Sequence, residues 1–308
     1  MKNRLYFFIL SLFLWSLFSC NKEKDIGYVE YVPKIAVEGW IENGTPATVM
    51  LTWTAPFDQK MDTAFLLEHV IRSAKVSVSD GEQTEILTLG SNSNYLPPYV
   101  YYGTSLKGEI GKSYSLKIEY RDGIISAETC IPEPVALEEI RFEKESPSDT
   151  TGYIYIRFLN TSDLYYQIAT RVDEKETVFT PCLYGNISSA SFGKNEMVSL
   201  QVSKGPVLYP QLNFSTYFTV GNTISLKFRT QPKDGYDFWT SWQNEVLNAQ
   251  NPIFPANTSL KSNISGGVGI WCGYGTYNYT LEKQYLGMFG KLGAELGFDF
   301  VIKHLFNK

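Results

Sequence analysis

Cys20 is the residue whose type and position point most directly to chemistry. It follows a basic start at Lys2 and Arg4, an apolar run over residues 5–18, and then Ser19. A basic segment, an apolar segment of about 7–15 residues and a small residue before the cut are typical of a secretory signal peptide. The thiol that directly follows this cut can take fatty acyl chains, so the sequence predicts acylation of Cys20.

The segment around Cys20 resembles a bacterial lipobox, in which the acylated Cys becomes the new N-terminus. Phe18 stands where most lipoboxes have a small residue, and the looser motifs of Bacteroidota accept it. One alternative is an ordinary cleaved signal peptide. Another is a membrane-spanning anchor, but the apolar run is shorter than the roughly 20 residues a spanning helix needs. Each buried methylene adds about 0.8 kcal/mol and two chains give stable anchoring. We therefore predict a signal peptide over 1–19 and an acylated tether over 20–33.

The residues behind Cys20 indicate where the anchor is delivered. Positions 21–25 read Asn-Lys-Glu-Lys-Asp. This resembles the export signal by which Bacteroidota lipoproteins reach the outer face of the outer membrane. A solvated, disordered tether is the simpler interpretation, and both can hold. The predicted localisation is the outer membrane, lipid-anchored and facing the cell exterior.

Three further cysteines remain: Cys130, Cys182 and Cys272. An odd number leaves at least one thiol unpaired, and an oxidising exterior permits one disulfide. Cys182 and Cys272 both lie in the second half, so we predict that pair. The alternative is three buried thiols that act as small apolar residues. No Cys-x-x-Cys occurs, so the sequence predicts no zinc site or redox motif of that type.

The search for catalytic residues gives little. The chain has two histidines, His69 and His304, without a His-Glu-x-x-His or Gly-x-Ser-x-Gly motif. A Ser-His-Asp triad needs only to meet in space, but surface or capping roles suit two isolated histidines better. Acidic pairs such as Glu138 and Glu139 are best explained as solvated faces. We predict a non-enzymatic protein without a catalytic residue, metal or cofactor.

Composition narrows the class of protein. The chain has 308 residues, 19% charged and 15% aromatic, with a formal net charge of −5. Nucleic-acid binding needs a basic stripe, so we predict no such partner. Abundant aromatic and β-branched residues favour strands. The length suggests two domains.

The sequence predicts that β-strands separated by turns position the cysteines, histidines and acidic residues considered above. In residues 34–133, apolar and polar residues alternate with the period of a half-buried strand, and Asn43-Gly44 is a strong hairpin signal. Residues 65–71 suit a short helix or buried loop, and residues 90–109 are predicted as a loop. The form is that of an immunoglobulin-like or transthyretin-like β-sandwich. The expected strands are 34–42, 47–54, 75–79, 84–89, 113–120 and 124–130.

Residues 134–308 form the second predicted domain, a β-rich sandwich or barrel-like unit with one helix. Apolar residues four apart predict that helix over 236–249, with its tryptophans in the core. The Gly-rich stretch 263–275 indicates a strand approached closely by other backbone. The tail 281–308 receives no assignment. The expected strands are 152–159, 164–172, 197–203, 214–220 and 223–230.

The order of these segments resembles a lipoprotein family of Bacteroidota, domain of unknown function 4249. The matching parts are Cys20, 35–41, 74–76 before Asp80-Gly81, 111–118, 251–254 and 263–269. The resemblance covers most of residues 20–275. Family members are generally found with genes for TonB-dependent outer-membrane transporters, so the resemblance implies an accessory lipoprotein of such a transporter. It implies no catalytic residues.

Three functions follow as hypotheses. The preferred one is a non-enzymatic binding or accessory protein that docks on a TonB-dependent transporter or holds a small-molecule, peptide or glycan ligand. The tyrosines of 99–102 and the aromatics of the second half could supply contact area, although core filling explains them more simply. A surface hydrolase with paired carboxylates and a structural or adhesive surface protein are the alternatives.

Overall fold

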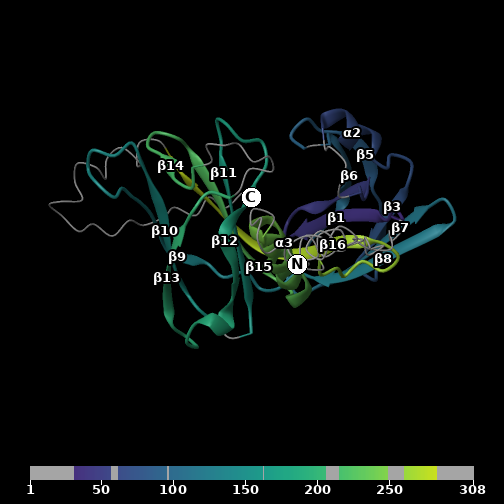
Figure 1. The fold of residues 1–308 in the computed structure, drawn as a ribbon. Coiled ribbons are helices and arrows are strands. Elements are labelled where there is room, and N and C mark those ends of the chain that lie inside the picture. Colours follow the sequence, from purple (N-terminus) through teal and green to yellow (C-terminus); the bar gives the residue numbers. More distant parts are fainter. Residues whose placement is uncertain are drawn as a thin grey trace, which may run out of the picture. The chain divides into compact units, whose positions relative to one another are not determined.

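A computed structural model describes residues 31–56, 62–95, 97–161, 163–205, 215–248 and 260–282. The predicted signal peptide, Cys20, His304 and the tail beyond 282 lie outside the described residues. The described residues from Lys34 onward belong to one compact unit. Its described part is mostly β, as predicted, with the strands arranged in several sheets (Figure 1). Within these ranges, no helix combines the length and the apolar character that crossing a membrane requires.

The largest sheet has eight strands and draws on both halves of the chain. Its centre is the long strand β16, which pairs in parallel with β1 and antiparallel with β15 (Figure 1). The strand order is β12 (Thr180–Ser188), β11 (Tyr165–Val172), β15 (Ile224–Gln231), β16 (Val268–Leu281), β1 (Ile35–Glu42), β2 (Pro46–Trp53), β6 (Tyr99–Lys107) and β5 (Thr88–Ser91).

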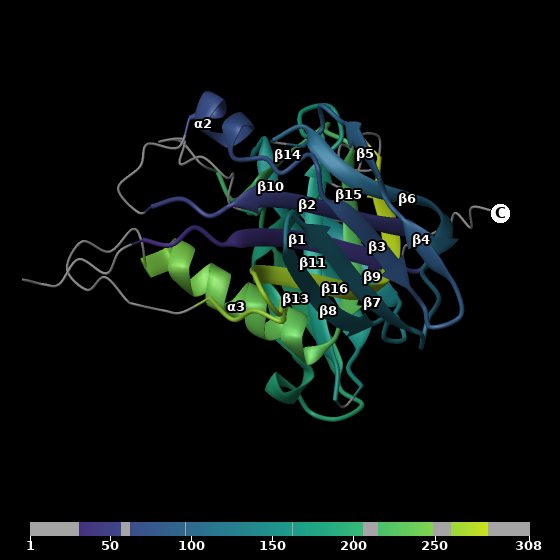
Figure 2. The same cartoon turned by 90° about the vertical axis from the view of Figure 1, so that its right-hand side faces the viewer.

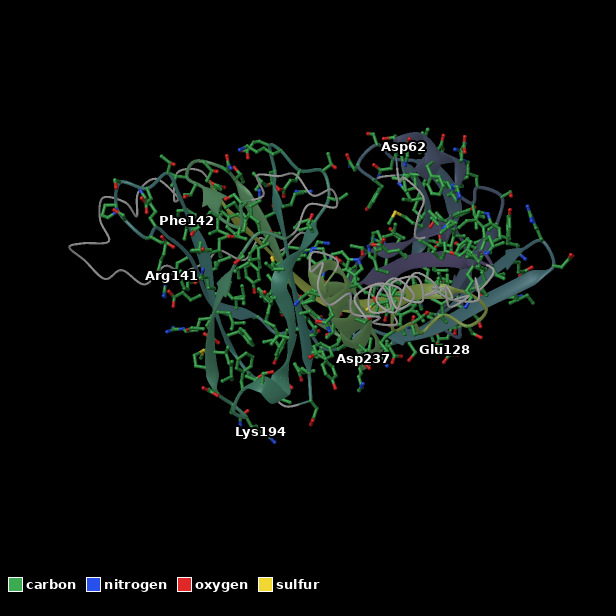
Figure 3. All side chains as sticks on the ribbon, viewed as in Figure 1. Asp62, Glu128, Arg141, Phe142, Lys194 and Asp237 are labelled. Atoms are coloured by element: carbon green, nitrogen blue, oxygen red, sulfur yellow. The ribbon has the colours of Figure 1, made fainter. Side chains whose placement is uncertain are left out.

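Two four-stranded sheets complete the β structure. One contains β13 (Met197–Val202), β10 (Thr151–Leu159), β14 (Phe218–Thr219) and β9 (Leu137–Glu143); the other contains β4 (Thr84–Ile86), β3 (Lys75–Ser79), β7 (Ser113–Tyr120) and β8 (Gly123–Cys130). The alternation that predicted the strands also assigns their faces. On β9, Phe142 is buried and its neighbour Arg141 is exposed (Figure 3).

Each small sheet shares a hydrophobic core with part of the large one. The first core joins β1 and β2 to β3, β7 and β8, and Trp271 on β16 is fully buried in it. The second joins β11, β15 and the end of β16 to β9, β10 and β13. The linker 131–136 runs between β8 and β9, and the predicted domain boundary at residue 133 falls within it. Because β16 contributes to both cores, the two-domain division stays a prediction.

Helices occupy three short stretches of the described residues. They are α2 (Thr63–Glu68), the 3₁₀ turn η1 (Ser189–Ser191) and α3 (Lys233–Asn248). The predicted helix over 236–249 is thereby confirmed. It packs on β16 (Figure 2). Phe238 and Trp239 contact Ile270, Cys272 and Tyr274 in a third, smaller core. This core lies on the face of the large sheet opposite the other two.

Some strands differ from the prediction. The expected loop over 90–109 contains the strand β6. Its pairing with β2 shifts register between Pro46 and Thr48. This irregularity interrupts the two-residue alternation by which a strand is predicted. The expected strand 84–89 divides at Leu87 into β4 and β5, which belong to different sheets. Strands β9 and β12 were not predicted, and β12 is irregular because Tyr184 adopts a left-handed φ of 58°.

Glu85 fastens β4 to β6 at this division. Its carboxylate accepts hydrogen bonds from the backbone N–H groups of Thr104, Ser105 and Leu106 at 2.6–3.0 Å, and from the Thr104 hydroxyl. Partial burial opposes ionisation, but these donors outweigh it and lower the pKa of Glu85 to about 2. The ionised form is therefore the one that holds β6 in place.

Replacing this carboxylate should weaken the fold in a pH-dependent way. We expect Glu85→Gln to lower the free energy of unfolding by about 1–2 kcal/mol at neutral pH, after allowance for solvent screening. Because the folded pKa is depressed, this contribution is complete above the unfolded pKa and disappears as the pH falls toward 2. Urea denaturation from pH 7 to pH 2 measures it. Glu82→Gln, in the adjoining exposed turn, is the control, and an equal loss there would contradict the assignment.

Candidate binding site

Charged and polar side chains gather on the face of the large sheet that carries α3. The strand registers place Gln167, Arg229 and Thr276 opposite one another on β11, β15 and β16. Glu42, at the end of β1, is paired with Tyr274 of β16. Lateral neighbours in a sheet lie about 4.8 Å apart. Five residues on this face, Glu42, Gln167, Lys227, Arg229 and Thr276, are called the Glu42 cluster below.

Glu42 binds two cations from the other half of the chain. Its Oε2 lies 2.6 Å from Lys227 Nζ, and its Oε1 lies 2.6 Å from Arg229 Nη2. The side chains are 5%, 18% and 12% exposed respectively. An ion pair this deeply buried is costly to desolvate, and removing one partner is also costly because it leaves a buried charge uncompensated. One carboxylate shared by two cations leaves this group of three with one excess positive charge.

The pKa values reflect this imbalance. Burial opposes ionisation of Glu42, but the charges of Arg229 and Lys227 outweigh it, so the pKa of Glu42 lies below its ordinary value. For Lys227 the balance is reversed. Burial and the neighbouring Arg229 lower its pKa, and the attraction of Glu42 compensates only in part. The cluster therefore has a firmly ionised carboxylate and a lysine that lacks full charge compensation.

Aromatic rings frame the cations. The guanidinium carbon of Arg229 lies 4.7 Å from the centroid of the Tyr274 ring, and Lys227 Nζ lies 4.8 Å from that of Phe179. Cations at such distances from ring faces are stabilised by the ring quadrupole. Near Glu42, Trp40 and Tyr95 approach to 6.0 Å between ring centroids. Burial raises the pKa of Tyr95, and the charges of nearby glutamates raise it further, so its hydroxyl stays protonated.

Several polar atoms of the cluster lack partners. Within the described residues, Arg229 Nε, Gln167 Nε2 and Thr276 Oγ1 are buried and make no hydrogen bond. The Gln167 amide is oriented by its Oε1, which accepts from Arg229 Nη1 at 3.0 Å, so its NH₂ is left unpaired. Buried polar groups nearly always have a partner. The two N–H donors and the hydroxyl therefore indicate that an acceptor belongs beside Arg229.

The predicted disulfide between Cys182 and Cys272 is wrong for this structure, in which both are free, buried thiols. Their strands β12 and β16 are separated by β11 and β15, which places them about 14 Å apart across the sheet. A disulfide needs Cα atoms about 4.4–6.8 Å apart. Cys130 of β8 lies beside β16, because its carbonyl oxygen would lie 2.3 Å from a Cβ on Gly273. It is exposed, so the alternative of three buried thiols is also incorrect.

The other candidate residues have structural roles. His69 ends α2, where its Nδ1 lies 2.8 Å from the Phe65 carbonyl oxygen and its ring stacks on Phe65. Of the two predicted roles, surface or capping, His69 has the capping one. Glu139 forms ion pairs with Arg141 and Arg157 on the surface of β9 and β10. Among the residues that the structure describes, no group of three or more His, Cys, Asp and Glu is arranged to hold a metal ion.

The sequence pattern predicts only part of the Glu42 cluster. Alternation places Glu38 and Glu42 on one face of β1, and Lys227 and Arg229 on one face of β15. In the sequence these faces look solvated. Their burial follows from the pairing of both strands with β16, which joins residues 185 and 187 positions apart. No local signal in a single sequence reports such a pairing.

Comparison with known proteins gives the family. No curated protein matches the chain. Residues 22–280 match the family model described as Domain of unknown function (DUF4249), which covers most of the chain and every strand described except the last residue of β16. The predicted resemblance is thereby confirmed, and the chain belongs to the DUF4249 family.

Proposed function

We propose that the protein is a surface-exposed outer-membrane lipoprotein that binds a ligand without chemical conversion, as an accessory component of a TonB-dependent transporter. The signal pattern that ends at Cys20 supports the anchor. The transporter is suggested by the gene neighbourhood that the family resemblance implies. The binding role rests on one observation, the buried and unpartnered polar atoms of the Glu42 cluster.

The cluster suits binding better than hydrolysis. A glycoside hydrolase needs a protonated carboxylic acid, with a raised pKa, near a second carboxylate. The two cations hold the pKa of Glu42 below its ordinary value, so it is ionised and cannot donate a proton at neutral pH. Its two oxygens are also occupied by Lys227 and Arg229. A fixed charge beside free donors is the arrangement of a recognition site.

The anchor is tested at Cys20. We expect radiolabelled palmitate to label the wild-type protein and not Cys20→Ser, which should leave the membrane fraction for the soluble one. The matched control is Cys130→Ser, because Cys130 is the exposed thiol of the described residues, and this variant should be labelled like the wild type. Unlabelled wild-type protein, or a membrane-bound Cys20→Ser variant, would contradict the lipid anchor.

The transporter association is tested by crosslinking in intact cells. A tag at Lys308 should recover a TonB-dependent transporter from detergent extracts of wild-type cells, identified by mass spectrometry. The Cys20→Ser variant should recover much less, because membrane anchoring concentrates both partners on one surface. Recovery of the lipoprotein without any such transporter would contradict the accessory role.

A further inference from the structure

We propose that the Glu42 cluster binds a ligand carboxylate, which accepts hydrogen bonds from Arg229 Nε and from the Gln167 amide or the Thr276 hydroxyl beside it. This inference rests on the proposed binding function and specifies the chemistry of its ligand. A Gln167 side chain with no exposed surface and an unpaired NH₂ is the observation that points to a bound group.

Charge selects an anion. Lys227 and Arg229 share the one carboxylate of Glu42. The next charges on this face compensate each other, because Arg171 Nε lies 2.8 Å from Asp173 Oδ1. Glu38 also lies on this face of β1, but desolvation raises the pKa of its carboxyl, so it supplies negative charge less readily than Glu42 does. The buried part of the site therefore lacks one negative charge.

The donors select a planar monoanion. Glu42 divides its oxygens between two cations, so Arg229 keeps its Nε–H free. The Gln167 amide and the Thr276 hydroxyl lie on the neighbouring strands to either side. A carboxylate bears one charge and has two acceptor oxygens, which match one excess positive charge and a small set of donors. A phosphate dianion would bring more charge than the site can compensate.

The surrounding side chains select an apolar, ring-bearing body for the ligand. Phe179 and Tyr95 come from two loops, residues 173–179 and 92–95, and Thr177 Oγ1 donates to the Asn94 carbonyl at 3.0 Å between them. Rings beside charged groups suit a ligand that has one charged end and one apolar end. The C-terminus of a peptide that ends in an aromatic residue fits this description, and a sugar acid offers the same carboxylate on a polar ring.

The test uses the full chain in detergent and ligands matched in shape. We expect phenylacetate to raise the melting temperature in a saturable way, while its neutral amide, phenylacetamide, leaves it unchanged. N-acetylphenylalanine and glucuronate distinguish the two sources, each against its neutral counterpart, N-acetylphenylalaninamide and glucose. Sulfate and phosphate test the preference for a planar anion. Calorimetric titration then gives the dissociation constant for each ligand that shifts the melting temperature.

One substitution separates binding from folding. Gln167→Glu keeps the shape of the side chain and the oxygen that accepts from Arg229 Nη1, so the fold should persist. The new carboxylate neutralises the excess positive charge of the site, and the substitution also removes the amide donor. We expect phenylacetate binding to weaken at least tenfold. Thr276→Val should weaken it less. The matched control is Gln201→Glu, the same charge change at an exposed position of β13, which should leave binding unchanged.

The outcomes divide cleanly. Loss of the phenylacetate response in a folded Gln167→Glu variant, with a normal response in Gln201→Glu, supports the proposal. No response to any carboxylate overturns it and leaves the polar atoms to bound water. Binding that persists in Gln167→Glu, or a response to sulfate or phosphate without one to phenylacetate, also overturns it. Because anchoring and transporter recovery are measured separately, the proposed function can hold even if the carboxylate site fails.

Discussion

Glu42→Gln should lower the free energy of unfolding by about 3–5 kcal/mol, the range measured when one partner of a buried ion pair is removed. The amide keeps the shape of the side chain and one acceptor. It leaves Lys227 and Arg229 buried with no opposing charge, whereas the wild-type distances to both are 2.6 Å. Urea denaturation at pH 7, with the midpoint and slope fitted together, measures the change.

An exposed carboxylate with two lysines is the matched control. Glu119 lies 2.9 Å from Lys117 and 3.4 Å from Lys75, but its side chain is 37% exposed. Solvent screens such contacts, so Glu119→Gln should destabilise the fold far less than Glu42→Gln does. Adding Lys227→Met to Glu42→Gln should recover part of the loss, because only one buried cation then remains. Equal costs for the two Glu→Gln variants would contradict a buried ion pair.

The pH dependence has a definite sign. The folded pKa of Glu42 is depressed, so its contribution is complete above the pKa of an unfolded glutamate, about 4.3. It is lost as the pH falls toward the lower pKa of the folded protein. Wild-type stability should therefore fall more steeply than that of Glu42→Gln below pH 4.3. The variant should regain stability at alkaline pH, because the pKa of Lys227 is already depressed in the fold and Lys227 loses its counter-charge.

The sequence predicts strands where one face is buried and the turn residues are distinctive. On β7, Tyr114, Leu116 and Ile118 are buried while the residues between them are exposed. The Asn43-Gly44 hairpin is confirmed, with Gly44 at a φ of 78°. The prediction fails where the register shifts, as in β6 and β12. There the two-residue period is interrupted, and pairing partners rather than local pattern decide the strand.

The site was harder to predict than the fold for the same reason. The pattern placed Lys227 and Arg229 together on one face, but it could not report that Glu42 would lie against them. That contact needs the parallel pairing of β1 with β16, in which Glu42 lies opposite Tyr274. Long-range register determines the cluster, and register depends on the whole sheet. The glycines of 263–275 gave the clearest advance signal, since they indicated close approach of other backbone to this strand.

Gly275→Ala should be a strongly damaging small substitution in β16. A Cβ at this position would lie 2.1 Å from the Pro132 carbonyl oxygen and 2.6 Å from Thr230 Oγ1. The linker 131–136 lies directly on β16 here, and Thr230 Oγ1 donates to the Glu133 carbonyl at 2.9 Å. Backbone cannot move aside as a flexible side chain can. We expect a loss of about 3 kcal/mol, the upper end for overpacking, measured by urea denaturation.

Gly123→Ala provides the comparison, because its Cβ would meet the Tyr120 carbonyl at 3.5 Å, an ordinary contact. It should change stability by less than about 1 kcal/mol. If Gly275→Ala were equally mild, the linker would not be held against β16, and the shared strand would not couple the two cores. If the loss is large, the linker and β15 are held against β16, the strand with which β1 also pairs. The arrangement of the Glu42 cluster then requires the close backbone packing that the glycines of β16 permit, as well as the charges of the cluster itself.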